Sequence, residues 1–498
     1  MENTAEDTQL ADVDSVPTQV APITRLATEI LMLIFTAGYL SIDRGHKEFV
    51  DCIGSVCRQW RVIALNTSLL WTQLEIDFNG IISGCHLNNW LSRSRHRMLD
   101  LRCQSSSLDT LHGPLQTVMH VLAPHIGRWR VMRFSLSGIN EMWAALSGLP
   151  SQVPSLEVLG VGVSNYSPLF EEAYNWNIRA PRLRRLVFYG IPCFPFGFSF
   201  HQHFPALTRV HLRGLTVCRL LGPGRHEPLG VLKALATLHH LEYLCIASAG
   251  IDLSWRNYRI PPRSERAILP ALKRFQFQAL QFDCIVAFMN SMEAPLLVSI
   301  LFTSPNPYRN DGIRFGSICP VKRNHYRHFP VLQRLTVYCN NSYVVDDPYL
   351  MHFIGIFKFK KVSFVESGKK MWRLIQLAGC KEAGVAMKSS RLIGVEIHSE
   401  NLPVPVAGLR QLVVGRRHSS NTNSSQSQPA TNKGGQRFTP LEEIHVCTST
   451  PLAEVDRTWF TKRMDMEQFS WSDSRACVAQ GKHFNNRLGW LRMTFAPA

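Results

Sequence analysis

The sequence is short of charge and has no long apolar run. Charged residues make up 18% and apolar residues 45% of its 498 residues, whereas an average globular protein is about 25% charged. A chain of this length and apolar content can bury a large core, so global disorder is excluded. A membrane-spanning helix needs roughly 18 or more consecutive apolar residues, and the sequence contains no such run.

The N-terminus lacks basic charge. Arg25 is the first basic residue, and the charged residues before it are all acidic: Glu2, Glu6, Asp7, Asp12 and Asp14. Secretory signals and mitochondrial presequences have the opposite character, so we expect neither. Residues 1–22 are small and polar as well as acidic, and we predict that they form a disordered tail.

Cysteine pairs with metal-ligand spacing are missing. The sequence has 13 cysteines but no C-x-x-C, and the closest pair, Cys52 and Cys57, falls within a helical pattern. A structural zinc site needs tight Cys or His pairs at both ends of a loop, so none is predicted. Scattered cysteines in odd number, without an export signal, indicate reduced and mostly buried thiols. We therefore expect a cytoplasmic or nuclear protein.

Familiar catalytic and cofactor motifs are missing too. The sequence has no Gly-rich dinucleotide fingerprint after a strand, no P-loop, no H-E-x-x-H and no G-x-S-x-G. The close histidine pairs are His201-x-His203 and His239-His240. We place the first pair in a loop, where solvated histidines are a simpler interpretation than a weak metal site. The chain is therefore expected to be non-catalytic, with no cofactor and no metal.

Positive charge is what the sequence has in excess. It contains 54 basic and 37 acidic residues, which gives a formal net charge of +17. Such a surface attracts acidic protein segments, nucleic acid or anionic lipid. The same excess also arises when arginines simply solvate the surface of a large apolar protein, and composition does not separate the two interpretations.

Two amphipathic helices are predicted near the N-terminus, at residues 28–37 and 46–66. In both segments apolar residues recur at the helical spacing, and Gly38 is a natural end for the first. About 40 residues of helix bury too little core to be stable alone, so such a unit leans on a neighbour or a partner. The apolar stripes therefore predict either an internal packing face or a docking face.

The residues of this region resemble an F-box. The resemblance rests on four stretches: residues 26–31 (LATEIL), 34–35 (IF), 56–64 (VCRQWRVIA) and 67–71 (TSLLW). It covers residues 23–72 and is most specific in its second half. Ala27 replaces the usual proline of the first helical turn, which should loosen the helix entry. Residues 38–49 lack the usual Leu-x-x-x-Asp-Leu spacing, so the middle helix is expected to be short or displaced.

The resemblance implies that this helical unit docks on the Skp-type adaptor of a cullin-RING ubiquitin ligase. An apolar helical face without a partner fits a helix-in-groove mode of binding. Trp60 is the best single anchor, because a buried Trp is a typical hot spot. The candidates for F-box core and adaptor contact are Leu26, Ile30, Leu31, Ile34, Phe35, Val56, Trp60 and Ile63. The sequence does not divide them between the two roles.

A second pattern, Leu-x-x-φ-x-φ with φ apolar, runs through the rest of the chain with proline two residues before the leucine. The prolines are Pro154, Pro181, Pro205, Pro270, Pro295 and Pro330, and the units are mostly 24–35 residues apart. Residues 183–188 (LRRLVF) are a good example. The units resemble leucine-rich repeats, which implies one parallel strand per repeat with helices or loops behind. The asparagine that usually follows the strand occurs only at Asn340.

The predicted fold class is α+β to α/β. A small helical F-box at 23–72 is followed at 73–498 by an irregular leucine-rich-repeat-like solenoid with a parallel sheet. We expect the sheet to start at 99–103 (LDLRC) and the linker 231–238 to be helical. Residues 416–437 are rich in Ser, Asn, Gln and Gly, which predicts a disordered loop. An ordinary α/β domain with several buried strands is the alternative.

The second and fifth positions of each repeat unit are predicted to face the concave side of the array, the usual binding surface of such folds. Strand alternation leaves open which of the two early x positions does so. In the better units these residues are Glu157 and Gly160, Arg184 and Val187, Thr208 and His211, Lys273 and Gln276, and Gln333 and Thr336. Arg184, His211 and Lys273 make the set basic and are the candidate substrate-binding residues. An acidic or phosphorylated protein segment is the predicted substrate.

These features together predict a substrate-recognition adaptor of a Skp–cullin–F-box ubiquitin ligase. Its F-box docks on the Skp adaptor and through it a cullin, while the repeat region holds the substrate near the conjugating enzyme. The alternative is a basic repeat scaffold that binds nucleic acid or an anionic surface and carries a vestigial F-box. Stacking recognition needs aromatic residues within one basic patch, and only Trp255 and Tyr258 lie beside an arginine cluster. That scarcity favours the adaptor.

Overall fold

The computed structural model consists of two compact units, Met1–Leu74 with Asn89–Arg97 and Glu75–Asn88 with Met98–Ala498, which we call the helical unit and the strand unit. The predicted tail at 1–22 lies outside the described residues. The structure describes residues 23, 26–42, 45–78, 84–105, 112–138, 142, 145–163, 178–190, 200–214, 228–247, 261–278, 280, 282–303, 328–338, 359–365, 393–399, 404, 406–421, 441–448, 451–464 and 469–473.

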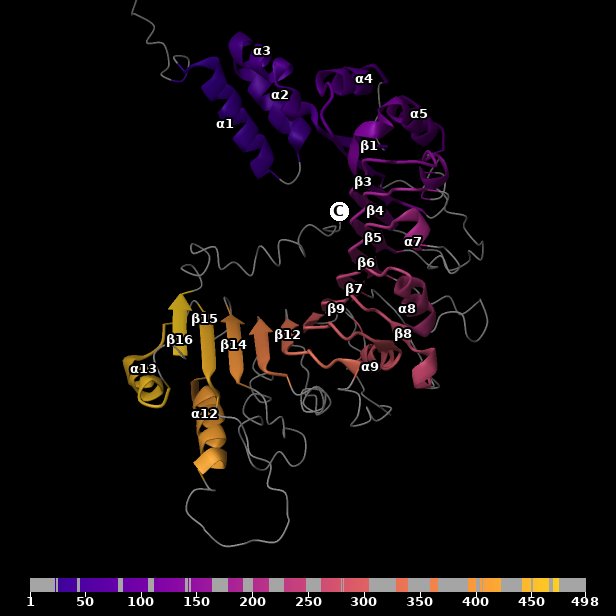
Figure 1. Ribbon diagram of the computed structural model, residues 1–498. Coiled ribbons are helices and arrows are strands. Elements are labelled where there is room, and N and C mark those ends of the chain that lie inside the picture. The colour runs from indigo at the N-terminus through magenta and orange to yellow at the C-terminus, as the bar shows by residue number, and fades with distance from the viewer. Residues whose placement is uncertain are drawn as a thin grey trace, which may run out of the picture. The chain divides into compact units, whose positions relative to one another are not determined.

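The helical unit begins with α1 (Thr28–Ser41), α2 (His46–Val56), α3 (Arg58–Asn66) and the short η2 (Ser68–Trp71) (Figure 1). The prediction that α1 ends at Gly38 is wrong. A Cβ at Gly38 would lie 2.8 Å from Cζ of Phe49, so the glycine makes room for that ring inside the helix rather than ending it. The helix ends at Ser41, because Ile42 takes an extended conformation.

The predicted helix at 46–66 is in fact two helices with a break at Cys57. Cys57 is extended, with φ −159° and ψ 170°. Its Sγ accepts a hydrogen bond from the Trp60 N–H at 3.5 Å, so it caps α3 as an N-cap side chain does. Apolar periodicity continues across the break, which is why the sequence pattern showed a single helix.

The core of the helical unit ties its helices to the residues that follow them. The Tyr39 hydroxyl accepts a hydrogen bond from the backbone N–H of Gln73 at 2.9 Å, and Tyr39 is fully buried. Trp71 Nε1 donates to the Ala64 carbonyl at 2.9 Å. The Trp71 and Trp90 rings meet edge to face at 4.7 Å. The Leu-Trp end of the F-box-like stretch therefore belongs to the core of this unit.

The strand unit is built around one long parallel sheet. Fourteen strands of the described chain form this sheet, in the order β1 (Gln73–Asp77), β2 (Leu99–Gln104), β3 (Trp129–Leu136), β4 (Val158–Val163), β5 (Arg185–Tyr189), β6 (Arg209–Arg213), β7 (Tyr243–Ala247), β9 (Arg274–Gln278), β11 (Ser299–Thr303), β12 (Arg334–Tyr338), β13 (Lys361–Val365), β14 (Gly394–Ser399), β15 (Glu443–Thr448) and β16 (Phe469–Asp473). Two further strands, β8 (Ala267–Ile268) and β10 (Met292–Glu293), pair separately. The sheet begins at β1, one strand before the predicted start at 99–103.

Each proline of the repeat pattern sits in a tight turn before a strand. The Leu183 N–H donates to the carbonyl of Ala180 at 3.1 Å, across Pro181 and Arg182. Proline presets φ for the second residue of such a turn. The same bond from the leucine to the residue three before it recurs in every proline-marked unit, at Leu156, Leu207, Leu272, Leu297 and Leu332. These leucines are all buried, so turn, anchor and strand recur as one unit.

The remaining helices are α4 (Gly84–Arg93), α5 (His112–Leu122), η3 (Ala123–Arg128), α7 (Phe200–His203), α8 (Pro228–Ala236), η6 (Arg263–Glu265), α9 (Phe282–Asn290), α12 (Val406–Asn421) and α13 (Glu454–Thr461). Helix α8 confirms the predicted helical linker. Helix α12 extends into the stretch predicted to be a loop at 416–437, and the rest of that stretch lies outside the described residues. No described helix has both the length and the apolar character needed to span a membrane.

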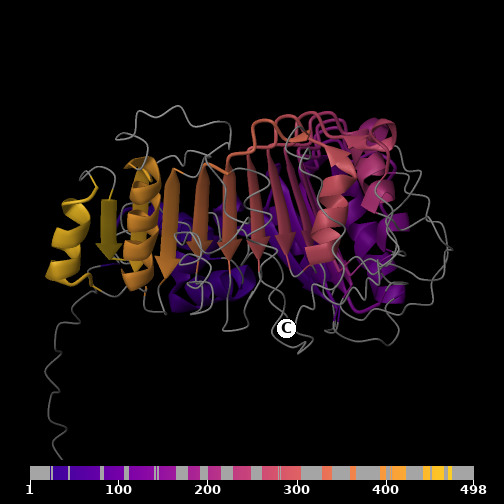
Figure 2. The ribbon, with the colours of Figure 1, turned by 90° about the horizontal axis from the view of Figure 1, so that it is seen from below.

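The two faces of the sheet differ in character. Figures 1 and 2 show α8 and α9 on one face, and the side chains pointing to that face are apolar and buried from strand to strand. One register row on this face is Leu159, Leu186, Val210, Leu244, Phe275, Ile300 and Leu335. The alternate positions form the other face, which we call the open face. The architecture is therefore α/β, with a helix-covered face and a largely polar one.

Candidate docking surfaces

Exposed apolar side chains are concentrated in the helical unit. Of the 15 large apolar residues exposed in the described part of the chain, 10 lie between Ile23 and Leu65. The most exposed of these are Leu33 at 65% and Leu40 at 63%. Exposed apolar residues concentrated in this way make the helical unit a candidate interaction surface.

The eight predicted F-box residues differ in burial. Three are buried in the core of the helical unit: Leu31, Phe35 and Ile63. Four are exposed: Leu26, Ile30, Ile34 and Val56. Trp60 is half-buried, and its ring meets that of Phe35 edge to face at 4.9 Å. Core and candidate contact residues therefore alternate along α1.

Sequence reasoning missed part of this exposed cluster. Met32, Leu33, Leu40, Val62 and Leu65 are exposed as well. The signal was present, because residues 30–35 read ILMLIF and a helix that is apolar all round buries more than one face. Only one of those faces is covered by α3 and its neighbours within the helical unit.

A row of arginines crosses the open face of the strand unit. We call it the basic row, and its residues are register partners at the first position of successive strands: Arg185, Arg209, Tyr243, Arg274, Ser299 and Arg334. Arg185 is 9% exposed, whereas Arg209, Arg274 and Arg334 are exposed. Neither Arg274 nor Arg334 forms an ion pair with another described residue.

Further arginines surround the first strands of the basic row. A Cβ at Gly160 would lie 3.2 Å from Cγ of Arg133, so the stem of Arg133 lies over β4 because no side chain stands there. Burial, together with the charges of Arg102 and Arg185, lowers the pKa of Arg133 to about 10. The Arg213 guanidinium lies over the Tyr189 ring, 5.4 Å from its centre. Positive charge is thus concentrated on β3 to β6.

His211 lies among these arginines but is not itself a cation. It is 6% exposed. Burial, and then the charges of Arg185, Arg209 and Arg213, lower its pKa to about 3. The prediction of His211 as part of a basic set therefore needs correction: it is a buried neutral imidazole at physiological pH. Its ring lies 4.9 Å from that of Tyr243.

Tyr243 and Gln276 lie beside His211 on the open face. The Tyr243 hydroxyl donates a hydrogen bond to Oε1 of Gln276, and burial raises the pKa of this hydroxyl. Gln276 is 4% exposed, and its Nε2 has no acceptor among the described residues. The part of the open face formed by His211, Tyr243 and Gln276 is therefore polar and uncharged.

Arg184 and Lys273, the other two predicted substrate-binding residues, lie one residue before β5 and β9. Both are exposed. Lys273 Nζ pairs with Glu242 Oε1 at 2.5 Å, which offsets its charge. Nearby, at the turns that precede the strands, lies a shallow pocket of ≈ 460 Å³ lined by Pro181, Pro205, Ala206, Thr208, His240, Glu242 and Ala271. The structure thus brings neither residue onto the open face beside His211.

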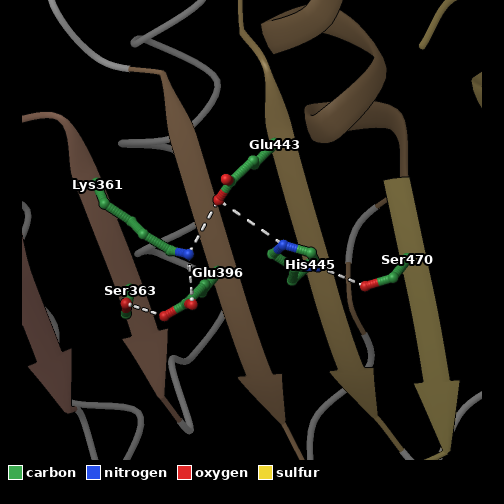
Figure 3. A network of polar contacts seen from close by, with 6 residues as sticks. All are labelled: Lys361, Ser363, Glu396, Glu443, His445 and Ser470. Atoms are coloured by element: carbon green, nitrogen blue, oxygen red, sulfur yellow. Dashed lines mark hydrogen bonds and ion pairs between the residues drawn. The ribbon is translucent and has the colours of Figure 1, made fainter. Parts of the chain in front are cut away.

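The open face changes character at β13, where charges are paired. Lys361 Nζ lies 2.8 Å from Glu396 Oε1 and 3.0 Å from Glu443 Oε2 (Figure 3). Ser363 donates to Glu396 at 2.5 Å. Burial by itself would raise the pKa of Glu396, but the hydrogen bonds from Lys361 and Ser363 and the Lys361 charge lower it. This part of the face is internally neutralised.

The same network reaches the last two strands of the sheet. His445 Nδ1 lies 2.6 Å from Ser470 Oγ, and its Nε2 lies 3.8 Å from Glu443 Oε2 (Figure 3).

Within the described part of the chain, no three His, Cys, Asp or Glu side chains are placed to hold a metal ion. His201 and His203, expected in a loop, lie in α7, and His203 Nδ1 is 3.0 Å from the Ile178 carbonyl.

Comparison with known proteins assigns neither surface. No protein-family model matches the chain, and no curated protein matches it. The exposed apolar cluster of the helical unit and the basic row of the strand unit are therefore the two features that bear on function.

Proposed function

We propose that this chain is the substrate-recognition subunit of a Skp–cullin–F-box ubiquitin ligase. Its helical unit binds the Skp-type adaptor, and its strand unit, as a leucine-rich-repeat-like array, binds the protein substrate. The chain itself catalyses nothing and acts in the cytoplasm or nucleus by holding the substrate near the conjugating enzyme. The observation that carries the proposal is the exposed apolar cluster on helices whose sequence resembles an F-box.

The energetics of that cluster favour a partner. Burying an Ile, Leu or Val side chain from water contributes about 1.5–3 kcal/mol. Ile30, Ile34 and Val56 are each about half exposed, so covering them offers several kcal/mol before the cost of association. An amphipathic helical surface that fits into an apolar groove gains this energy, which is the binding mode that the F-box resemblance implies.

Co-purification with the cognate Skp adaptor tests the proposal. We expect Ile30→Asp combined with Ile34→Asp to abolish adaptor binding, since an unpaired carboxylate in an apolar groove is strongly unfavourable. Both positions are exposed in the free chain, so the variant should still fold. Val455→Asp is the matched control, because Val455 is 77% exposed and lies on α13 of the strand unit. Retention of adaptor by the double variant contradicts the proposal.

A second function, binding of nucleic acid or another polyanion, is favoured by one observation. Tyr243 stands between Arg209 and Arg274 in the basic row, and Arg213 covers the Tyr189 ring. This is the interleaving of aromatic and basic residues that stacking recognition uses. A titration with single-stranded RNA at rising salt separates the functions: tight binding that is unaffected by the Ile30→Asp, Ile34→Asp variant would favour this second one.

A further inference from the structure

The spacing of arginines along the basic row defines which substrate segment it fits. Neighbouring strands in a sheet are about 4.8 Å apart. Arg185 and Arg209 are direct register partners, so their stems start one strand apart. Tyr243 separates Arg209 from Arg274, and Ser299 separates Arg274 from Arg334. The row thus consists of a pair of arginines followed by two single ones, each two strands, or about 10 Å, further on.

We propose that the substrate segment lies extended across β5 to β12, with a phosphate between Arg185 and Arg209 and carboxylates opposite Arg274 and Arg334. This rests on the proposed function of the strand unit as the substrate-binding region. It does not depend on which adaptor the helical unit binds.

Chain geometry gives the spacing of the acidic groups. A segment in the polyproline II conformation advances about 3.1 Å per residue and presents every third side chain on the same face. The midpoint of the arginine pair is about 12 Å from Arg274, which corresponds to three or four residues. Arg274 and Arg334 are about 10 Å apart, which corresponds to three residues. The row therefore fits a phosphoresidue, an acid three or four residues away, and a second acid three residues beyond it.

The arginine pair favours phosphate over carboxylate. A phosphate carries about −1.5 to −2 charges and three acceptor oxygens, and it suits two guanidinium forks at once. Arg185 is only 9% exposed, so its charge acts in a less polar medium than an exposed one. Arg133 and Arg213 add positive charge nearby. Burial first, and then the charges of neighbouring arginines, lower the pKa values of Arg133 and His211.

Both ends of the row are defined by the structure. Before Arg185 the register partner on β4 is Val158. After Arg334 the partner on β13 is Lys361, whose Nζ is already held by Glu396 and Glu443. An acidic segment therefore gains nothing by extending over β13, and would meet two carboxylates there. The segment is confined to six strands of the open face.

Peptide binding to the full-length chain, followed by fluorescence anisotropy, tests the inference. The register peptides carry phosphothreonine, an Asp three or four residues away and a second Asp three residues beyond it, in an Ala/Ser background and in both chain directions. The control peptide has the same composition, with Asp at the second and fourth residues from the phosphate. We expect at least one register peptide to bind about tenfold more tightly than the control and than its own unphosphorylated form.

Arginine variants connect the peptide positions to the row. Arg274→Ala and Arg334→Ala should each weaken binding of the register peptide by about threefold to fivefold. Each variant should abolish the gain in binding that one of the two Asp residues provides and leave the gain from the other unchanged. Arg209→Ala should remove most of the gain from phosphorylation. Arg209 is exposed, so this variant avoids the folding risk of changing buried Arg185. Arg182→Ala, an exposed arginine in the turn before β5, is the matched control and should have no effect.

The outcomes separate this inference from the proposed function. Equal binding of register and control peptides would show that binding to the open face depends only on the net charge of the peptide and not on the positions of its acidic residues. That result would overturn the inference. Displacement of the register peptide by single-stranded RNA that binds more tightly than any peptide would overturn it in favour of nucleic acid. Loss of adaptor binding in the Ile30→Asp, Ile34→Asp variant, with peptide binding intact, supports both proposals. Peptide selectivity in a chain that never binds adaptor would support the inference and contradict the ligase assignment.

Discussion

The helical unit and the strand unit bury their apolar residues in different ways. In the strand unit the buried positions form continuous apolar rows across neighbouring strands, so Leu186, Val210 and Leu244 are all fully buried. The helical unit buries Leu31 and Tyr39 fully, yet leaves Ile30, Leu33 and Ile34 of the same helix exposed. From this difference we expect the strand unit to fold by itself and, under the proposed function, the helical unit to be completed by a partner.

The largest expected effect is loss of folding in an isolated helical unit. A fragment of residues 23–97 contains every described residue of that unit but should show no cooperative thermal transition alone, because so small a core is marginal. Added adaptor should restore a transition. A fragment ending at residue 75 should respond less to adaptor, since it lacks Trp90, the ring that packs on Trp71. A cooperative melt of either fragment alone would contradict this difference between the helical unit and the strand unit.

The second effect separates core from surface within α1. Phe35→Ala should lower the free energy of unfolding by about 3–5 kcal/mol, because Phe35 is 2% exposed and contacts Trp60. Leu33→Ala should change it by less than about 0.5 kcal/mol, because Leu33 is 65% exposed. Urea unfolding of the full chain gives both values. Similar losses in the two variants would mean that Leu33 is covered in the free protein.

The third effect concerns acid sensitivity of the strand unit. The pKa of His211 is about 3 in the folded state, against 6.5 for an ordinary His. A folded pKa below the unfolded one means that its contribution to stability is complete above pH 6.5 and is lost as pH falls toward 3. At pH 5 the loss should be about 2 kcal/mol.

Comparison of urea unfolding at pH 7 and pH 5 measures that loss. His211→Asn should reduce the difference between the two pH values. His240→Gln, a change at an exposed histidine, should leave it unchanged. If wild-type chain and His211→Asn lose the same stability at pH 5, His211 is not the buried neutral group that the geometry indicates.

The smallest effect is expected at the low-complexity stretch. Its first residues up to Asn421 belong to α12, so the deletion that spares the helix covers 422–435. A loop contributes mainly closure entropy, which changes slowly with length, and the loss should stay below about 1 kcal/mol. A thermal melt of the deletion chain checks this, and a large fall would extend the packed part of the strand unit beyond α12.

The sequence predicted the features that depend on local physics. Proline presets the turn at Pro181, and Leu183 after it is apolar enough to anchor the strand, so the parallel strands were recognisable from β4 to β12. The helix α8 followed from its apolar residues in the same way. The apolar periodicity of residues 28–66 identified helices, although it did not show the break at Cys57 or the passage of α1 through Gly38.

Those two features depend on contacts between distant residues. Gly38 is needed because the ring of Phe49 approaches it, and a pattern within one helix carries no record of a neighbour. The same limit applied to the F-box-like residues. Phe35 and Ile34 are adjacent and apolar, and only the packing of α3 on α1 decides that Phe35 is buried and Ile34 exposed.

The charge of the open face most clearly separates what the sequence determined from what the tertiary structure decided. The sequence by itself determined that the chain is basic and that arginines recur near the strands. It did not determine that the row runs through Arg185, Arg209 and Arg274 instead of through Arg184 and Lys273. Strand register decides this, because moving by one residue along a strand moves the side chain to the other face. Burial beside other charges then makes His211 neutral, while pairing with Glu396 and Glu443 neutralises Lys361, and both effects arise only once separate strands lie side by side.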